Sequence, residues 1–203
     1  MNWDEKIADG LAEEGIVVVD EFLSMPEVRE ILSLPLFREP ENHMRFAGIG
    51  HGMERQVNEA IRGDMIKWLD RRTAPPPVAA YLSRIESLIQ YLNRNLFLSL
   101  KDYEIHATAY PPGTFYKRHL DQFKRDDHRK LSVICYLNPD WQSQWGGQLR
   151  IFGAGEPRDI IPIAGRLVCF RSDQIEHEVL PATALRRSLT GWLLDQLSDL
   201  RKL

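Results

Sequence analysis

After Leu98 the sequence breaks into short runs in which apolar and polar residues alternate. Alternation with a period of two is typical of β-strands that bury one face. Turn-forming words such as Pro111-Pro112-Gly113 and Gly146-Gly147 separate the runs. The predicted strands are residues 103–110, 115–121, 131–137, 148–152, 159–163, 166–171, 177–180 and 187–194. Eight short strands in series predict a sandwich or a jelly roll.

Residues 1–97 have a different pattern and are expected to be mostly helical. Trp3, Ile7 and Leu11 recur at helical spacing, and a capping box that starts at Ser24 predicts a second helix. Residues 78–92 carry an apolar stripe with a period of 3.6, which predicts the longest helix, lying against a sheet. We therefore predict an α+β fold with a single domain over residues 1–203. In it, residues 1–97 give helical support packed on one sheet, and residues 98–197 form the β core.

Composition excludes several other classes of protein. Hydrophobic residues make up 43% and charged residues 27% of the chain, as in packed globular proteins. The formal net charge of −3 argues against a nucleic-acid partner. The N-terminus has no signal-peptide pattern, and no apolar run reaches the ~18 residues that a membrane span needs. Because Cys135 and Cys169 lie singly in apolar runs, as buried reduced thiols do, we expect a cytoplasmic protein without a membrane partner.

Three residues with metal-ligating side chains stand out among the predicted strands. His119 and Asp121 are two positions apart, so their side chains should share one face of a strand. His177 begins another strand directly after a polar turn. Two histidines and one carboxylate on one face of a metal are the ligands of non-haem Fe(II) oxygenases. The pattern favours an iron site, although each residue taken alone also fits a solvated side chain.

A cationic residue lies on the last predicted strand. Arg186 shares its parity with Ser188 and Thr190. A basic side chain on an inward-facing strand is costly unless it is paired, and a guanidinium suits bidentate binding of a carboxylate. Tyr136 could donate a hydrogen bond to the same carboxylate, so a dianionic co-substrate would satisfy both. Alternatively, Arg186 and Arg187 are solvated turn residues, and Tyr136 is a core tyrosine with a satisfied hydroxyl.

The order of these residues resembles the signature of the 2-oxoglutarate oxygenases: His-x-Asp, a second histidine 56 positions after Asp121, and an arginine nine positions further on. The surrounding sequence motifs resemble those of the prolyl 4-hydroxylase branch, in particular the hypoxia-inducible-factor prolyl hydroxylases and their bacterial relatives. The resemblance spans roughly residues 62–69 and 103–195, about half of the chain. The matching words include Arg62-Gly63-Asp64-x-Ile66-x-Trp68, Tyr116-x-Arg118-His119-x-Asp121, Tyr136-Leu137-Asn138-x-Asp140-Trp141 and His177-Glu178-Val179-x-Pro181-Ala182.

This resemblance implies a double-stranded β-helix and a 2-oxoglutarate- and Fe(II)-dependent dioxygenase. Such an enzyme uses O₂, with ascorbate as a stimulant, hydroxylates C4 of a prolyl residue in a protein, and releases succinate and CO₂. By residue-by-residue match, His119, Asp121, His177 and Arg186 are the catalytic set, and the first three hold the metal. Arg186 and Tyr136 meet the distal carboxylate of 2-oxoglutarate, Tyr110 and Thr190 line its pocket, and Arg129 touches the target peptide. Likeness to the bacterial relatives suggests a translation elongation factor as one target.

Departures from the family pattern concern the target more than the chemistry. The loop before His177 is shorter by one residue, and Arg171 stands where the animal enzymes carry an aromatic residue. Three alternatives therefore stay open: an oxygenase of the same family acting on another peptide residue, a small molecule or a nucleic-acid base; a jelly-roll metal-binding protein without oxygenase activity; and an interaction module with a degenerate site.

Two further features have weaker interpretations. His106 shares its parity with Tyr110, so it is expected at the wall of the pocket. Residues 46–63 contain four glycines and no sustained periodicity. Long loops of this kind are often binding loops, and we expect this one to fold over a bound peptide and to shape the choice of target.

Overall fold

The structure is a computed structural model that describes residues 2–48, 58, 60–122, 127–153 and 155–198. Most of the loop expected over a bound peptide, residues 49–57 and 59, lies outside the described residues. The helices are α1 (Trp3–Glu13), α2 (Met25–Leu32), α3 (Pro35–Arg38), α4 (Pro40–His43), α5 (Pro76–Leu96) and the short 3₁₀ helix η2 (Ser143–Trp145). The strands are β1 (Ile16–Val19), β2 (Arg45–Phe46), β3 (Met65–Trp68), β4 (Asp102–Tyr110), β5 (Tyr116–His119), β6 (Arg129–Tyr136), β7 (Leu149–Phe152), β8 (Arg158–Ile160), β9 (Leu167–Arg171), β10 (Glu176–Val179) and β11 (Arg186–Leu194).

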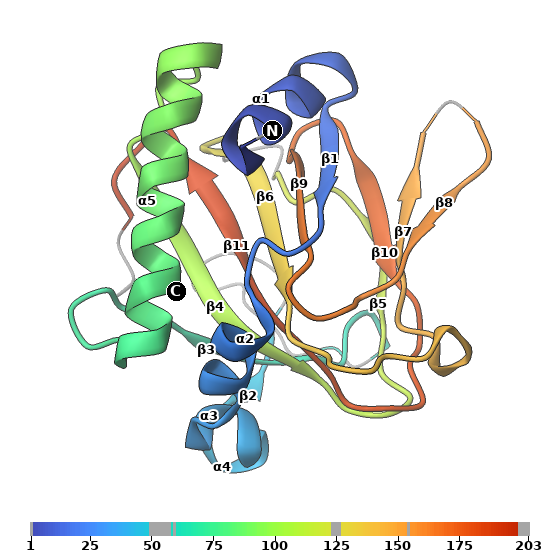
Figure 1. The fold of residues 1–203 in the computed structure, drawn as a ribbon. Coiled ribbons are helices and arrows are strands. Elements are labelled where there is room, and N and C mark those ends of the chain that lie inside the picture. The colour runs from blue at the N-terminus through green and yellow to red at the C-terminus, as the bar shows by residue number, and fades with distance from the viewer. Residues whose placement is uncertain (1, 49–57, 59, 123–126, 154, 199–203) are drawn as a thin grey trace.

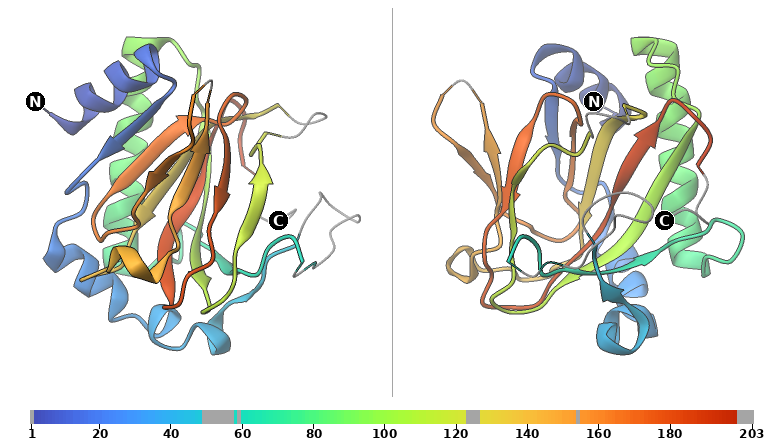
Figure 2. Two further views of the ribbon diagram at one scale, coloured as in Figure 1. Left: turned by 90° about the vertical axis from the view of Figure 1, so that its right-hand side faces the viewer. Right: turned by 180° about the vertical axis from the view of Figure 1, so that it is seen from behind.

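These strands form two antiparallel sheets. The large sheet has seven strands in the order β1-β9-β6-β11-β4-β3-β2, and the small sheet has four in the order β5-β10-β7-β8. Helices α1 and α5 lie on the same side of the large sheet (Figure 1). The small sheet lies on the opposite side of the large sheet from these helices (Figure 2). The fold is the predicted α+β jelly roll, with helices on one sheet and β4–β11 as the core.

Helices α2 and α5 form for the reasons that the sequence indicates. In α2 the capping box is present, because the backbone N–H of Ser24 donates to Oε2 of Glu27 at 2.7 Å. Helix α5 starts at Pro76, where a missing N–H costs no hydrogen bond. Its apolar stripe is buried throughout and consists of Val78, Tyr81, Leu82, Ile85, Leu88, Ile89 and Leu92. This stripe holds the helix against the sheet.

The large sheet separates two hydrophobic clusters. Alternate residues of β4 and β11, including Ile105, Ala107 and Leu189, pack with α1 and α5 in the first cluster. The residues between them point the other way, toward the small sheet. There Tyr136, Phe170 and their neighbours pack against the residues of β7 and β10 in the second cluster. The functional pocket opens within this second layer.

The sequence predictions correspond to the observed elements with two corrections. All eight predicted strands after Leu98 are present, with ends that differ by up to three residues. The strand predicted over residues 115–121 includes Asp121, but strand β5 stops at His119 and Asp121 lies in a bend beyond it. The first 97 residues, expected mostly as helical support, also add β2 and β3 to the large sheet, whereas β1 is the strand that the β-branched run of residues 16–19 indicates.

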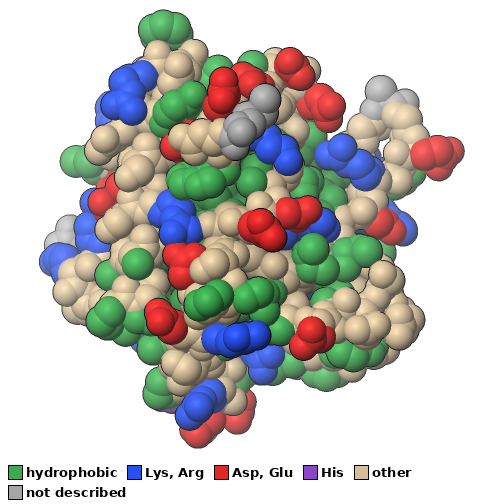
Figure 3. Space-filling view, viewed as in Figure 1, with side chains coloured by type: hydrophobic (Ala, Val, Ile, Leu, Met, Phe, Trp, Pro, Cys, Tyr) green, Lys and Arg blue, Asp and Glu red, His purple; other side chains and the backbone are tan. Residues whose placement is uncertain are grey.

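The described surface shows no sign of a membrane span. Among the described residues, no helix is both long enough and apolar enough to cross a bilayer. On the face of the molecule shown in Figure 3, basic and acidic side chains are interspersed. Cys135 and Cys169 are buried and unpaired, as expected, and burial raises the pKa of both thiols.

Candidate metal centre and co-substrate pocket

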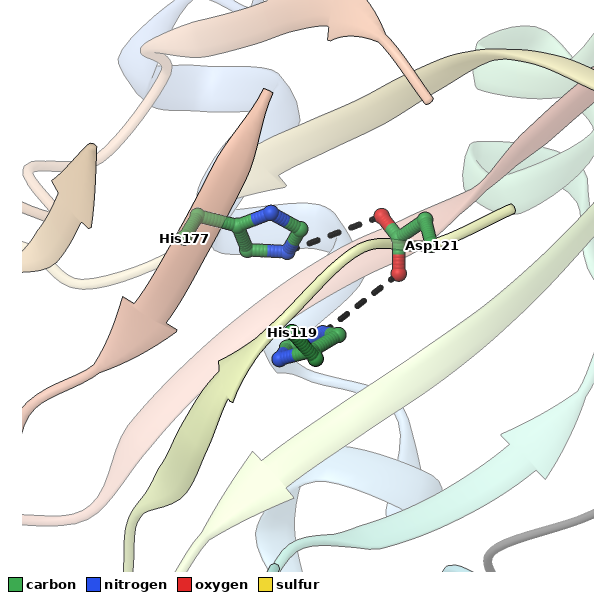
Figure 4. A group of neighbouring side chains, drawn as sticks. All are labelled: His119, Asp121 and His177. Carbon is green, nitrogen blue, oxygen red and sulfur yellow. Dashed lines mark ion pairs between the residues drawn. The ribbon is translucent and has the colours of Figure 1, made fainter. Parts of the chain in front are cut away.

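His119, Asp121 and His177 converge at the open edge of the small sheet. Strand β5 carries His119 at its end, and β10 carries His177 directly opposite it. Nε2 of His119 lies 3.5 Å from Oδ1 of Asp121, and Nε2 of His177 lies 3.6 Å from Oδ2. Both imidazole rings point toward the carboxylate (Figure 4). One ligand atom from each residue lies within 4.8 Å of the others, which is a spacing that fits a single metal ion.

Hydrogen bonds fix which nitrogen each histidine offers. Nδ1 of His119 lies 2.6 Å from the carbonyl oxygen of Lys117, and Nδ1 of His177 lies 3.0 Å from that of Ile175. A carbonyl oxygen can only accept, so in both rings Nδ1 is the protonated nitrogen. Nε2 therefore keeps its lone pair and faces Asp121. Partners of this kind orient the histidine ligands of metal sites.

The carboxylate of Asp121 is oriented by two buried serines. The hydroxyl of Ser132 donates to Oδ2 of Asp121 at 2.7 Å, and the hydroxyl of Ser172 lies 2.8 Å from that of Ser132. Since Ser132 donates to Asp121, Ser172 must donate to Ser132. Burial alone would raise the pKa of Asp121, but its electrostatic interactions with His177 and His119 and the hydrogen bond from Ser132 lower it well below its usual range. The carboxylate is thus held in its charged form, which is the form that binds a cation.

His177 is held in the neutral form that a metal requires. Its side chain is only 4% exposed, and it packs at 4.8 Å against the ring of Phe170. Burial lowers the pKa of His177 to about 4, although the charge of Asp121 acts in the opposite direction. The side chain of His119 is more open, at 16% exposed. The donor set of two neutral imidazoles and one carboxylate fits Fe(II) and leaves other coordination positions free.

Arg186 lies in the core, which excludes the alternative of a solvated turn residue. It is 1% exposed at the start of β11, the central strand of the large sheet. Its Nε donates to the carbonyl oxygen of Gly147 at 2.9 Å, and its guanidinium lies 5.0 Å from the ring centres of both Tyr110 and Tyr136. Nη2 of Arg186 and the hydroxyl of Tyr136 are buried without a hydrogen-bond partner among the described residues. Two such donors are costly to bury, and a carboxylate would satisfy both.

The other residues predicted for the site lie around the same pocket. Tyr110 and Thr190 line it, with the hydroxyl of Thr190 2.9 Å from that of Ser188. His106 also lines it and does not join the three-residue metal group found among the described residues. Arg129 lies behind the pocket wall, with its guanidinium 3.5 Å from the ring centre of Trp192 and ion-paired with Glu104 at 3.4 Å.

Three residues of the pocket were not predicted to be site residues, although all three belong to the sequence motifs that carry the family resemblance. Arg62 and Asp64 form a bidentate ion pair with N–O distances of 2.7 and 2.6 Å. The ring of Tyr116 stacks on that of His119, with centres 3.7 Å apart and planes inclined by 17°. Tyr116 and His119 are three positions apart, so strand alternation predicts opposite faces for them. Only the pairing of β5 with β10 reveals the contact.

Comparison with known proteins identifies the family to which this chain belongs. Residues 105–194 match the model of the 2OG-Fe(II) oxygenase superfamily. A prolyl-4-hydroxylase from Pseudomonas putida has the same fold with a TM-score of 0.84, and 40% of the aligned residues are identical over 94% of this chain and 98% of that one. The chain belongs to the 2OG-Fe(II) oxygenase superfamily. Its members use Fe(II), 2-oxoglutarate and O₂, and the His-Asp-His group fits that requirement.

Several of the similar proteins within the superfamily are prolyl hydroxylases. The structure of a prolyl hydroxylase from Trichoplax adhaerens, in complex with a peptide fragment of hypoxia-inducible factor, superposes with a TM-score of 0.84 at 30% identity, over 95% of this chain and 89% of that one. Egl nine homolog 1 of Homo sapiens is 32% identical over 210 residues, which is 94% of this chain. The chain spans only 46% of that human protein. The family resemblance seen in the sequence is therefore confirmed.

Proposed function

We propose that this protein is a 2-oxoglutarate- and Fe(II)-dependent dioxygenase that hydroxylates C4 of a prolyl residue in a protein and releases succinate and CO₂. One observation carries the oxygenase part. The pocket has a metal-ligand triad, and it also contains a buried arginine and a tyrosine with unpaired donors. A metal ion and a dicarboxylate would complete the site. The likeness to the prolyl hydroxylases of Pseudomonas putida and Trichoplax adhaerens supports proline as the target residue.

Each residue of the site has a definite task in this proposal. His119, Asp121 and His177 hold the iron through Nε2, a carboxylate oxygen and Nε2. Arg186 and Tyr136 bind the distal carboxylate of 2-oxoglutarate, and this fixes the orientation of the molecule in the pocket. Tyr110 of β4 is paired with Arg186 of β11, and its ring lies against the guanidinium of Arg186.

The remaining side chains control what reaches the metal. Thr190 lines the co-substrate pocket. Arg129 lies behind Trp192 of the pocket wall, and it is the residue that the family resemblance assigns to contact with the target peptide. Bound iron, together with 2-oxoglutarate and O₂, supplies an oxidation in which one oxygen atom enters succinate and the other enters an unactivated C–H bond. The apolar walls, which include Leu149, Val179 and Ile134, limit the access of water to that chemistry.

The target and its compartment belong to the same proposal. We propose a protein substrate with an exposed proline, and a translation elongation factor is the candidate that likeness to the bacterial hydroxylases supports. We place the enzyme in the cytoplasm, because two buried and unpaired cysteines suit a reducing compartment. Cell fractionation followed by immunodetection tests the location.

Mass spectrometry tests the reaction and finds the target in one experiment. A cell extract is incubated with the enzyme, Fe(II), 2-oxoglutarate and ascorbate, and its peptides are compared with those of an extract treated with the His177→Ala variant. The expected result is one peptide whose mass increases by one oxygen atom, with the fragment ions placing that atom on proline. Fragment ions that place it on another residue would support a different protein hydroxylase of the same family.

A metal-binding protein without oxygenase activity gives a different result. In that case Fe(II) would bind to the triad, but 2-oxoglutarate would neither bind nor be converted to succinate. The unpaired donors of Arg186 and Tyr136 argue against this function, because a metal alone would leave both of them buried without a partner.

A further inference from the structure

Strand β5 contains an irregularity next to the metal centre. His177 of β10 pairs with His119, and Val179 pairs with Tyr116, so three positions on β5 oppose two on β10. An extra residue of this kind is a β-bulge, which reverses the alternation of side chains and is common beside active sites. It brings the rings of Tyr116 and His119 to one face, where they stack 3.7 Å apart.

A third layer covers the other side of Tyr116. The guanidinium of Arg62 lies 4.3 Å from the centre of the Tyr116 ring. The imidazole of His119 already occupies one face of that ring at 3.7 Å, so Arg62 must occupy the opposite face. Arg62 is itself fixed by two hydrogen bonds to Asp64, whose side chain is fully buried. The three side chains form a column that ends at a metal ligand, and we call Arg62, Tyr116 and His119 the stacked column.

The backbone also ties this column together. Residues Ile61 to Gly63 lie against β5, with Lys117 N donating to Ile61 O at 2.9 Å and Gly63 N donating to Phe115 O at 3.0 Å. A Cβ atom at Gly63 would lie 2.8 Å from Cβ of Thr114, so only glycine allows this close approach. The position of Arg62 over Tyr116 is therefore set by covalent neighbours as well as by its ion pair.

The two histidine ligands differ in what surrounds them. His177 is 4% exposed and packs against Phe170 of the core. His119 lies at the end of β5, which among the described residues is the edge strand of the small sheet, and there only the short segment of residues 61–63 runs beside it. Its backbone hydrogen bond to Lys117 fixes the protonated nitrogen, but a single hydrogen bond leaves the ring free to tilt. The stacked column supplies the wall that the core supplies for His177.

We propose that Tyr116, braced by Arg62 and Asp64, is a positioning residue that fixes the plane of the His119 imidazole and thereby sets metal affinity. This inference rests on the metal site of the proposed function. Groups that orient a metal ligand without touching the metal typically change its affinity 10- to 100-fold when they are removed. Tyr116→Leu removes the flat ring, Tyr116→Phe keeps it, and Arg62→Met removes the brace while Tyr116 stays.

Binding of Co(II), followed by its visible absorption, tests the role without any need for turnover. The unaltered protein and all three variants are titrated with Co(II) in the absence of 2-oxoglutarate. Tyr116→Leu should weaken binding by about 10- to 100-fold and shift the absorption bands, because the imidazole can tilt. Tyr116→Phe should restore both properties, and Arg62→Met should have a smaller effect in the same direction as Tyr116→Leu.

A similar arrangement elsewhere in the molecule serves as the control. Arg71 lies 4.7 Å from the ring centre of Tyr103 and pairs with Asp102, but neither residue touches the metal group. Tyr103→Leu should therefore lower stability without changing Co(II) affinity or its spectrum.

The outcomes separate this inference from the metal assignment itself. A folded Tyr116→Leu variant with normal affinity and spectrum overturns the positioning role. If that variant does not fold, normal Co(II) binding by Arg62→Met overturns it instead. Absence of Co(II) binding by the unaltered protein overturns the metal site, and the positioning role with it.

Discussion

The metal ligands lie at an edge of the small sheet, whereas Arg186 lies on the central strand of the large one. The side chains of His119 and Asp121 are 16% and 11% exposed, and Asp121 follows the end of its strand. Arg186 is 1% exposed, between two tyrosine rings. The two ends of one pocket are therefore built on elements that differ in exposure and in their position within the sheets.

The difference shows how each end tolerates the absence of its ligand. At the metal end each ligand has a hydrogen-bond partner, because Asp121 accepts from Ser132 and both imidazoles donate through Nδ1 to backbone carbonyl oxygens. At the anchor end, Nη2 of Arg186 and the hydroxyl of Tyr136 have no partner. Burying a charge without its partner destabilises a protein. We infer that the anchor end lowers stability until a carboxylate arrives.

Loss of a metal ligand should have the largest effect on activity. In His177→Ala we expect succinate production to fall below detection, because the remaining two ligands cannot hold iron in position. Circular dichroism should show an intact fold, since the triad is not needed for the hydrophobic clusters. His43→Ala, which removes an exposed histidine from α4, serves as the control and should retain full activity. Near-normal succinate release by His177→Ala would mean that the metal lies elsewhere.

Arg186→Met should affect binding and stability in opposite directions. The KM for 2-oxoglutarate should rise roughly 10- to 150-fold, because a charge-assisted hydrogen bond contributes about 1.5–3 kcal/mol. The free energy of unfolding without ligand should stay unchanged or rise by up to ~2 kcal/mol, because an unpaired charge leaves the core. Steady-state succinate release at varied 2-oxoglutarate measures the KM, and unfolding without ligand measures the stability. A large loss of stability in the unliganded variant would contradict the view that Arg186 is kept for its ligand.

The neighbouring arginine provides a matched control for that experiment. Arg187 points to the other side of the large sheet, where its Nε donates to the carbonyl oxygen of Phe37 at 3.2 Å. Arg187→Met should lower the free energy of unfolding by ~1 kcal/mol and leave the KM for 2-oxoglutarate unchanged. If the KM rose in Arg187→Met and not in Arg186→Met, the assignment of the anchor would be wrong.

The anchor end could be predicted from the sequence more completely than the metal end. The nine-residue offset from His177 in the family resemblance favours Arg186 over Arg187, and strand parity agrees, because β11 is a long, regular strand whose side chains alternate without interruption. The metal end depends on irregular structure. Asp121 lies in a bend, and Tyr116 reaches His119 only through a bulge.

That bulge has no local signal in the sequence. It follows from the pairing of β5 with β10, whose paired residues are about 60 positions apart. For the same reason the family motif marks Arg62 and Asp64 in the sequence, but the residues that they contact cannot be predicted from it. Local periodicity thus predicts regular elements, and the departures that shape the metal site need the tertiary contacts.

Acid should destabilise the protein through the histidine buried on the large sheet. Burial, with a further effect of the charge of Arg62, lowers the pKa of His106 to about 3, against about 6.5 in an unfolded chain. As the pH falls below about 6.5, the unfolded chain takes up a proton that the folded chain does not, so the free energy of unfolding falls until about pH 3. At pH 5 this amounts to about 2 kcal/mol.

Denaturant unfolding of the metal-free protein at pH 7.5 and pH 5 measures the effect. His106→Met should lose about 2 kcal/mol less than the unaltered protein over this interval. His43→Met, at an exposed position, should show the same pH dependence as the unaltered protein. Equal losses in all three proteins would show that the buried histidine of the large sheet does not set the acid limit.

The smallest effect should come from the second donor of the anchor. Tyr136→Phe removes one hydroxyl from a buried position where no other described residue is its hydrogen-bond partner. If that hydroxyl donates to 2-oxoglutarate, its loss should raise the KM by about 2- to 12-fold, because a single hydrogen bond contributes about 0.5–1.5 kcal/mol. Stability without ligand should not fall, since no hydrogen bond within the protein is lost.

Tyr81 is the matched control for this last change. Its hydroxyl is also buried without a partner, but it lies on α5, in the cluster on the other side of the large sheet. Tyr81→Phe should likewise preserve stability, and it should leave the KM for 2-oxoglutarate unchanged. The comparison isolates the ligand, because each variant removes a buried hydroxyl without a partner among the described residues, Tyr136 between the two sheets and Tyr81 between the large sheet and α5. Equal KM values for Tyr136→Phe and Tyr81→Phe would leave Arg186 as the sole anchor of the two.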